Sequence, residues 1–322
     1  MRTRRLGYTD LHLTTIGLGT WAIGGPWQHG WGPQDDTESI AAIQTALDVG
    51  INWIDTAPAY GLGHSEEIVG RAIAGRRDEV IVATKCGLVW EEGNTWVDNQ
   101  LSAGSIESEC EASLRRLNVD VIDLYQIHWP LPDEGIEEAW TTIAKLVQDG
   151  KVRYGGVSNF SRAQLERVRP IHPAASLQPP YSMLERAVEE ELLAYCEANA
   201  TGVVAYSPMQ AGLLTGKYTP KRVAALPDDD WRNRSRHFQE PELGHNLELV
   251  EGLRPIAERS GRTLAQLSIA WVLRRPELTA AIVGARRPAQ IMETAQAGDW
   301  ELSAEDITEI DGLLALRDQA LA

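Results

Sequence analysis

The chain has 322 residues, 43% of them hydrophobic, so it can bury a large core. Its 30 basic and 46 acidic residues give a net charge of −16, which argues against nucleic acid or an anionic membrane as a partner. No apolar run approaches the ~20 residues of a membrane span, and no apolar run of signal-peptide type follows the basic start at Met1–Arg5. We therefore expect a cytoplasmic protein.

Predicted strands and helices alternate along nearly the whole chain. Residues 2–15 alternate polar and apolar around a glycine-containing turn, which predicts a β-hairpin ahead of the main fold. Apolar runs predict strands at 15–21, 51–54, 80–85, 121–128, 151–159, 174–178, 202–208 and 278–283. Helical patterns follow at 36–49, 65–74, 103–117, 135–148, after Ser161, at 188–199, 264–273, 288–297 and 307–316. Eight strand–helix units imply one (β/α)8 barrel domain over residues 1–322.

Residues 215–246 interrupt this alternation, because the segment is too long and too mixed for an ordinary connection. It carries several basic residues among prolines and aspartates. One interpretation is a solvated surface excursion. The other is a mobile lid over a phosphate-bearing cofactor, which its place after the seventh strand favours.

Titratable residues stand where several predicted strands end. Asp55 ends the second strand, Lys85 the third and His128 the fourth, and Tyr60 lies in the loop that follows Asp55. Loops after the strands of a parallel barrel gather at one mouth, so these four side chains are expected to converge there. Three widely spaced cysteines and seven histidines show no metal-ligand spacing, and no metal site is expected.

This pattern resembles the aldo-keto reductase family, whose Asp, Tyr, Lys and His tetrad falls here on Asp55, Tyr60, Lys85 and His128. The resemblance implies reduction of aldehydes and ketones to alcohols by hydride transfer, with Tyr60 as proton donor. A free phenol titrates near pH ~10, and Lys85 beside it is expected to lower that pKa. Asp55 would hold Lys85 by an ion pair, and His128 would orient the carbonyl.

The same resemblance implies the cofactor contacts, in place of a glycine-rich dinucleotide fingerprint, for which Gly61-Leu-Gly63 is only a partial match. Gly19, Thr20 and Trp21 are expected to lie against the cofactor. Expected nicotinamide contacts are Ser158, Asn159 and Gln178, with Tyr206 stacked on the ring. Expected pyrophosphate contacts are Ser207, Leu213 and Lys217. Expected adenosine contacts are Gly284, Arg286, Gln290 and Glu293. Thr294 stands where the family generally has Asn, which puts one adenine contact in doubt.

Arg286 and Arg287 are adjacent at a helix N-terminus, an arrangement that suits a phosphate monoester. NADPH/NADP+ is therefore favoured over NADH. Four indoles near the mouth, Trp27, Trp31, Trp90 and Trp129, are expected to line the substrate site and to favour flat apolar carbonyl compounds.

Two other functions are found on barrels of this kind. A hydrolase would need paired carboxylates at suitable spacing or a His/Asp metal cluster, and the seven histidines include no close pair at metal-ligand spacing with carboxylates, which disfavours it. A slow or non-catalytic NADPH sensor, like the potassium-channel β-subunits that share this type of chain, stays open.

Overall fold

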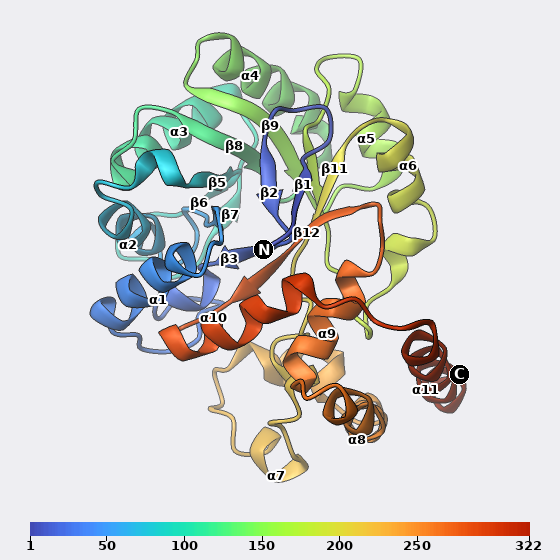
Figure 1. Cartoon of the computed structure of the whole chain (residues 1–322). Coiled ribbons are helices and arrows are strands. Elements are labelled where there is room, and N and C mark those ends of the chain that lie inside the picture. The colour runs from blue at the N-terminus through green and yellow to red at the C-terminus, as the bar shows by residue number, and fades with distance from the viewer.

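A computed structural model describes all of residues 1–322. Eight parallel strands close into a barrel (Figure 1). In order around it they are β3 (Ile16–Gly19), β4 (Trp53–Asp55), β5 (Ile81–Cys86), β8 (Ile122–Ile127), β9 (Val152–Ser158), β10 (Ser176–Gln178), β11 (Gly202–Ala205) and β12 (Leu278–Gly284), and β12 pairs again with β3. The predicted (β/α)8 barrel is confirmed.

Helices ring this barrel because their apolar faces pack against the outside of the strands. They are α1 (Asp36–Asp48), α2 (His64–Ala72), α3 (Ala103–Leu117), α4 (Ile136–Gln148), α5 (Arg162–Val168), α6 (Leu192–Ala198), α9 (Leu264–Leu273) and α10 (Pro288–Ala295). Local sequence starts several of them. Ser161 and Thr263 each form a capping box that binds the first free backbone N–H groups of α5 and α9.

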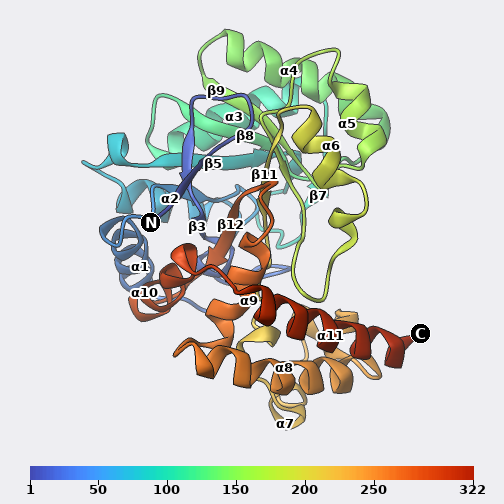
Figure 2. The same cartoon turned by 45° about the vertical axis from the view of Figure 1, so that its right-hand side comes forward.

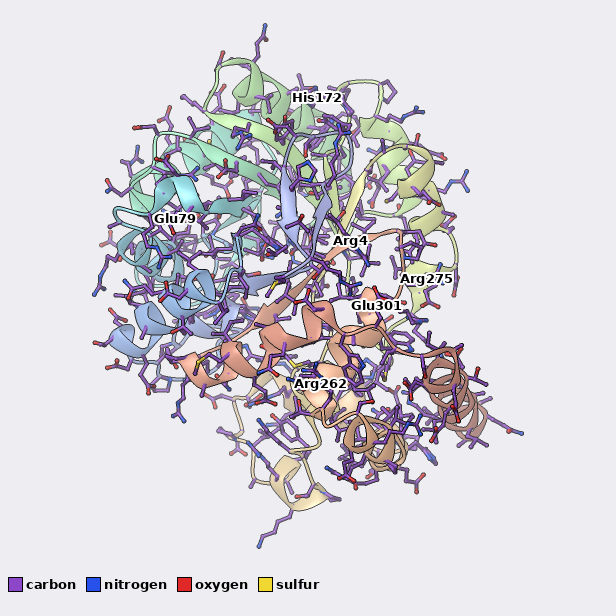
Figure 3. The ribbon with its side chains drawn as sticks, viewed as in Figure 1. Arg4, Glu79, His172, Arg262, Arg275 and Glu301 are labelled. Carbon is purple, nitrogen blue, oxygen red and sulfur yellow. The ribbon has the colours of Figure 1, made fainter.

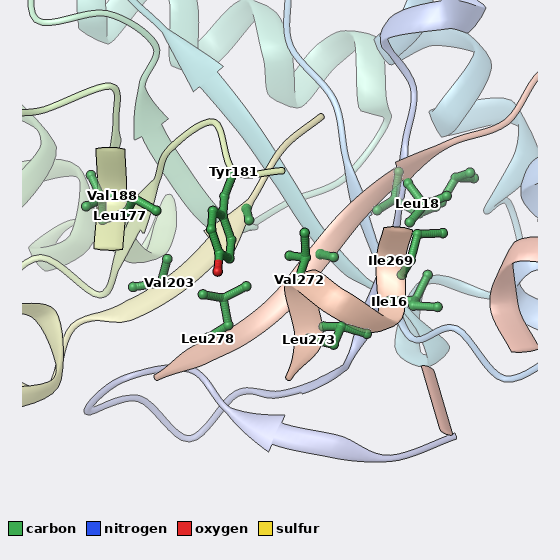
Figure 4. Packing of buried hydrophobic residues seen from close by; sticks show 14 of the residues in the cluster. Ile16, Leu18, Leu177, Tyr181, Val188, Val203, Ile269, Val272, Leu273 and Leu278 are labelled. Carbon is green, nitrogen blue, oxygen red and sulfur yellow. The ribbon is translucent and has the colours of Figure 1, made fainter. Parts of the chain in front are cut away.

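The core has two parts. The larger cluster lies between the strands and the helices, and it includes Leu177, Val203 and Leu278 of neighbouring strands and Val272 of α9 (Figure 4). The smaller cluster fills the barrel interior and includes Trp53 and Leu124. Side chains of alternate strand residues thus supply both layers, as expected for a filled barrel.

The predicted hairpin is present as β1 (Thr3–Arg5) and β2 (His12–Thr14), which pair antiparallel. Its residues Leu6, Leu11 and Leu13 are buried in the interior cluster. Arg4 donates to the carbonyl oxygen of Arg275 over 3.0 Å, and both residues are labelled in Figure 3. The hairpin therefore closes one end of the barrel, opposite the strand ends that carry Asp55 and Lys85.

Elements beyond the regular alternation were only partly predicted. Segment 215–246 contains the short α7 (Pro220–Val223), and an unpredicted helix, α8 (Glu242–Arg259), begins inside it. The terminal helix α11 (Ala304–Leu321) runs five residues beyond its predicted end, and it lies alongside α8 (Figure 2). The loop after β5 contains two further short strands, β6 (Leu88–Val89) and β7 (Asp98–Asn99). None of the helices combines the length and apolar character that a membrane crossing requires.

Two leucines of α11 test how this helix is held. Leu314 is buried in the large core, whereas Leu316 is 65% exposed. Leu314→Ala should lower the free energy of unfolding by about 2–5 kcal/mol because it leaves a cavity, and Leu316→Ala should change it by less than about 0.5 kcal/mol. Urea denaturation measures both. Equal effects would mean that α11 is not packed on the domain as described.

Candidate active site

Alternation along the strands decides which polar side chains enter the barrel. Trp53 and Ala83 belong to the interior cluster, so Asp55 and Lys85, two residues further along β4 and β5, also point inward. On β8 the same rule places Gln126 two residues after the inward Leu124. A polar layer therefore lies above the apolar layer, at the carboxyl ends of the strands.

Lys85 is the centre of this polar layer and is fully buried. Its ammonium Nζ donates to Asp55 Oδ1 over 2.6 Å and to the carbonyl oxygen of Thr56 over 2.9 Å. It also donates to the hydroxyl of Tyr60 over 3.4 Å. The predicted Asp55–Lys85 ion pair is confirmed, and the ammonium links the carboxylate to the phenol.

Tyr60 reaches this layer from the loop after β4. Gly61 follows it with φ +66°, and a Cβ there would lie 1.8 Å from the carbonyl oxygen of Gly24. Only glycine fits such a close backbone approach. The contact fixes the Tyr60 turn against the loop that follows β3.

His128 completes the predicted group of four. Its ring stands edge-on to the Tyr60 ring, with 5.8 Å between the ring centroids. Its backbone N–H donates to the carbonyl oxygen of Cys86, and its carbonyl oxygen accepts from the side chain of Asn159. Its Nδ1 is buried without a hydrogen-bond partner. The structure thus brings Asp55, Tyr60, Lys85 and His128 together.

Burial sets the protonation of this group. It lowers the pKa of His128 well below the ordinary value, with help from the Lys85 charge, and it also lowers the pKa of Lys85. Burial and the Asp55 charge raise the pKa of Tyr60 well above 10. We expected Lys85 to lower that pKa. The expectation is corrected because Asp55 neutralises the ammonium, so desolvation of the phenol dominates.

Two glutamines surround the second oxygen of Asp55. Gln178 Nε2 donates to Oδ2 over 2.8 Å, and Gln126 Nε2 approaches the same atom at 3.4 Å. No protein group donates to Oε1 of Gln178. Gln126 was not predicted as a site residue, although its place two residues before His128 on one strand was a usable signal.

Several expected nicotinamide contacts form one hydrogen-bonded group. Ser158 Oγ donates to the carbonyl oxygen of Gln178 over 2.8 Å, and Asn159 Nδ2 donates to Ser158 Oγ over 3.1 Å. Tyr206 Oη donates to Asn159 Oδ1 over 2.9 Å. Asn159 has φ +63°, a left-handed conformation that asparagine tolerates. This group adjoins His128 through Asn159.

Other expected cofactor contacts lie around the same mouth. Gly19 ends β3 beside Asp55, and Thr20 Oγ1 donates to the carbonyl oxygen of Asp55. Trp21 packs on Trp31 and Trp231, with ring centroids 5.6 and 5.0 Å away.

The segment after β11 carries the expected pyrophosphate contacts. Ser207 has φ +56°, Leu213 is buried, and Lys217 is exposed. Gln210, Ala211 and Gly212 between them also have positive φ.

The expected adenosine contacts lie at the end of β12 and the start of α10. Arg286 donates to Gln34 Oε1 over 2.6 Å and to the carbonyl oxygens of Trp31 and Pro33, so the loop after β3 engages its guanidinium. Gln290 Oε1 accepts from the backbone N–H of Arg286 over 2.8 Å. Gly284 is exposed and Glu293 partly buried.

The four expected substrate tryptophans are not equally close to the tetrad. Trp27 packs near Tyr60, with 6.2 Å between ring centroids, and Trp129 stacks on His128 at 6.4 Å. Trp31 packs on Trp231 at 5.9 Å, and Arg232 lies over its ring. Trp90 packs instead against Arg116 of α3. The assignment of these side chains to substrate stays a prediction.

Comparison with known proteins decides the family. A model of the aldo/keto reductase family matches residues 15–315. The chain belongs to the aldo/keto reductase family. It is 42% identical to aldo-keto reductase YhdN of Bacillus subtilis over 309 residues, 95% of this chain and 91% of that protein. It is 37% identical to the NADH-specific methylglyoxal reductase of Escherichia coli over 324 aligned positions, 96% of this chain and 97% of that protein.

Solved structures of similar proteins also belong to this family. The glycerol dehydrogenase AKR11B4 from Gluconobacter oxydans superposes with a TM-score of 0.89 at 42% identity, covering 98% of this chain and 95% of that one. The holo form of aldo-keto reductase AKR11C1 from Bacillus halodurans gives 0.82 at 29% identity, covering 97% and 96%. The chain is thus an aldo/keto reductase, an oxidoreductase of carbonyl compounds from a family that uses a nicotinamide cofactor.

The buried ion pair of this aldo/keto reductase can be tested without any substrate. Asp55→Ala leaves the Lys85 ammonium buried without its carboxylate, which should lower the free energy of unfolding by about 3–5 kcal/mol. Adding Lys85→Met should recover part of that loss, because no charge then stays buried. Urea denaturation of the two single variants and the double variant gives the coupling energy. Additive losses would contradict a direct Asp55–Lys85 interaction.

Proposed function

We propose that this aldo/keto reductase reduces aldehydes and ketones to alcohols by hydride transfer, with Tyr60 as the proton donor and NADPH as the preferred cofactor. The observation that carries the proposal is the arrangement around Lys85. One ammonium binds both Asp55 and the Tyr60 hydroxyl, and the His128 ring stands against Tyr60. These four groups come from three strand ends and one loop, so they define a single point in the mouth of the barrel.

Each side chain has a distinct part in this proposal. A nicotinamide cofactor supplies the hydride when bound. Tyr60 is protonated at neutral pH, since a phenol titrates near pH ~10 and burial raises its pKa further, so it holds a proton to give to the substrate oxygen. The Lys85 ammonium stabilises the phenolate left behind. His128 is neutral because its pKa is lowered, and a ring N–H can donate to the carbonyl oxygen and orient it.

The residues around the tetrad fit the amide of a nicotinamide. Gln178 directs its Nε2 to Asp55 and leaves Oε1 free to accept an amide N–H. Asn159 and Ser158 lie next to it, and Tyr206 is held by Asn159. Each of these residues was assigned to the nicotinamide by the family resemblance, and their proximity supports that assignment.

Selection of NADPH rests on Arg286 and its neighbour Arg287 at the start of α10. Two cations at a helix N-terminus suit the 2′-phosphate. A relative at 37% identity is described as NADH-specific, so family membership alone does not select the cofactor. In this chain the Arg286 guanidinium also binds the loop at 31–34, and a phosphate would have to replace some of those acceptors.

Tyr60→Phe tests the proton donor. The variant should lose about a hundredfold or more in kcat for aromatic aldehydes and for methylglyoxal, because general acids contribute about that much. Its Kd for NADPH, measured by fluorescence titration, should stay near the wild-type value. A variant that keeps more than about a tenth of the activity would assign the proton to another group.

The same assay decides between enzyme and sensor. If the wild-type protein binds NADPH tightly and turns over no aldehyde or ketone, the reductase proposal fails and the sensor remains.

Arg286→Ala tests cofactor selection, with Arg287→Ala as the neighbouring comparison. A charge-assisted interaction contributes about 1.5–3 kcal/mol, so Arg286→Ala should raise the Kd for NADPH about tenfold or more and leave NADH nearly unchanged. Arg287 is exposed and faces Glu38 at 3.5 Å, so its removal should have a smaller effect. Equal weakening of both cofactors by Arg286→Ala would place Arg286 away from the 2′-phosphate.

A further inference from the structure

The turn at Cys86–Gly87, directly after Lys85, joins two members of the tetrad. The carbonyl oxygen of Cys86 accepts from the backbone N–H of His128 over 2.9 Å. Gly87 has φ +90°, and a Cβ at this position would approach Leu101 to 2.9 Å. Any shift of this turn would therefore move the ends of both β5 and β8.

A carboxylate of α3 holds this turn from outside the barrel. Glu109 Oε2 accepts from the backbone N–H of Gly87 over 2.8 Å. Its Oε1 accepts from Ser105 Oγ, one helical turn earlier, over 2.8 Å. Both oxygens are engaged, and Glu109 has no contact with the inward side chains of the tetrad.

A second acidic residue behind the same strand shows what is unusual about Glu109. Glu66 of α2 is fully buried, accepts from Thr84 Oγ1 over 2.6 Å and is paired with Arg116 at 2.7 Å. Arg116 is thus committed to Glu66, and no salt bridge reaches Glu109. Two carboxylates flank the end of β5, and only one has a cation.

We infer that Glu109 is a positioning residue for the tetrad, and that its ionised carboxylate fixes the Cys86–Gly87 turn from which Lys85 and His128 take their places. The inference rests on the proposed reductase function. A carboxylate binds an N–H roughly twice as strongly as a neutral acceptor does, so protonation of Glu109 should loosen the turn. Activity should then depend on the charge of a group that touches neither substrate nor cofactor.

The pH range of this effect follows from its surroundings. Burial raises the pKa of Glu109 to about 7, while the Arg116 charge, Ser105 and the backbone N–H groups oppose that rise. The other titratable groups that interact with it are Cys86 of β5 and Tyr125 of β8. Burial raises the pKa of both, so neither carries charge near neutral pH. Burial also raises the pKa of the next residue, Cys110.

Neither His128 nor Tyr60 of the tetrad is expected to titrate in this pH range. The pKa of His128 lies well below its ordinary value, and that of Tyr60 lies well above 10. A rise in kcat with an apparent pKa near 7 would therefore report Glu109. Stability should change in the opposite direction. Because the folded-state pKa is raised, the stabilisation is complete below the unfolded-state pKa of ~4.3 and is lost as pH rises to about 7.

The test compares Glu109→Gln with Glu107→Gln, a control on the same helix whose carboxylate forms an exposed pair with Lys145. The amide approximates protonated Glu109, since it can accept from Gly87 and donate to Ser105. Wild-type kcat for an aromatic aldehyde with saturating NADPH should rise roughly three- to tenfold between pH 6 and pH 8, as expected for a loss of about 1 kcal/mol. Glu109→Gln should stay at the low value throughout, and Glu107→Gln should follow the wild type.

A measurement without turnover separates this inference from the reductase proposal. Hydrogen exchange at the Gly87 amide, expressed as a protection factor, should increase between pH 6 and pH 8 in the wild type and in Glu107→Gln but not in Glu109→Gln. If no carbonyl compound is reduced yet this difference in protection appears, the reductase proposal is wrong, but the role of Glu109 in fixing the Cys86–Gly87 turn is supported. If turnover occurs and Glu109→Gln keeps the wild-type pH profile, the positioning role is overturned.

Discussion

A buried cation governs the arrangement of this barrel mouth. An unpaired ammonium in a protein interior is strongly unfavourable, so Lys85 requires acceptors on every accessible side. Asp55 Oδ1, the carbonyl oxygen of Thr56 and the Tyr60 hydroxyl supply them. Each acceptor comes from the β4 end or its loop, which must therefore keep its register against β5. The geometry proposed for catalysis is thus also a condition for folding.

The constraint extends from Lys85 to its counter-ion. Asp55 has a second oxygen to satisfy, and Gln178 reaches it from the opposite side of the barrel, with Gln126 close by. Ser176 Oγ in turn donates to Gln126 Oε1 over 3.3 Å. This polar layer lies directly above the apolar layer of Trp53, Ala83 and Leu124. The apolar layer excludes water from one side, and so the polar groups must satisfy one another.

The sequence predicted this group of four residues well because the carboxyl ends of all strands in a parallel barrel lie at the same mouth. Asp55, Lys85 and His128 each end an apolar run, and Tyr60 stands in a turn next to Gly61. That topology brings them together was predictable. The direction of the pKa shift of Tyr60 was not predictable, because the balance between the Lys85 charge and desolvation depends on how deeply the phenol is buried.

Residues outside this pattern could not be found by the same reasoning. Glu109 lies on α3 two residues from both Glu107 and Glu111, so it faces another side of the helix than they do, but the sequence does not show that this side contacts Gly87. Helix α8 contains Pro255, which is unfavourable inside a helix, and its tertiary packing against α11 compensates. In both cases the deciding contact joins segments far apart in the sequence.

The loop after β3 carries the last physical link, because it touches both ends of the proposed site. At one end, Trp27 packs near Tyr60 and Gly24 lies against Gly61. At the other end, the carbonyl oxygens of Trp31 and Pro33 accept from Arg286, the residue that we propose selects NADPH. A phosphate that binds Arg286 would therefore compete with the carbonyl oxygens that attach this loop to Arg286. Since the Trp31 ring packs on Trp231 of segment 215–246, the same competition reaches the segment for which a mobile lid was one of two interpretations.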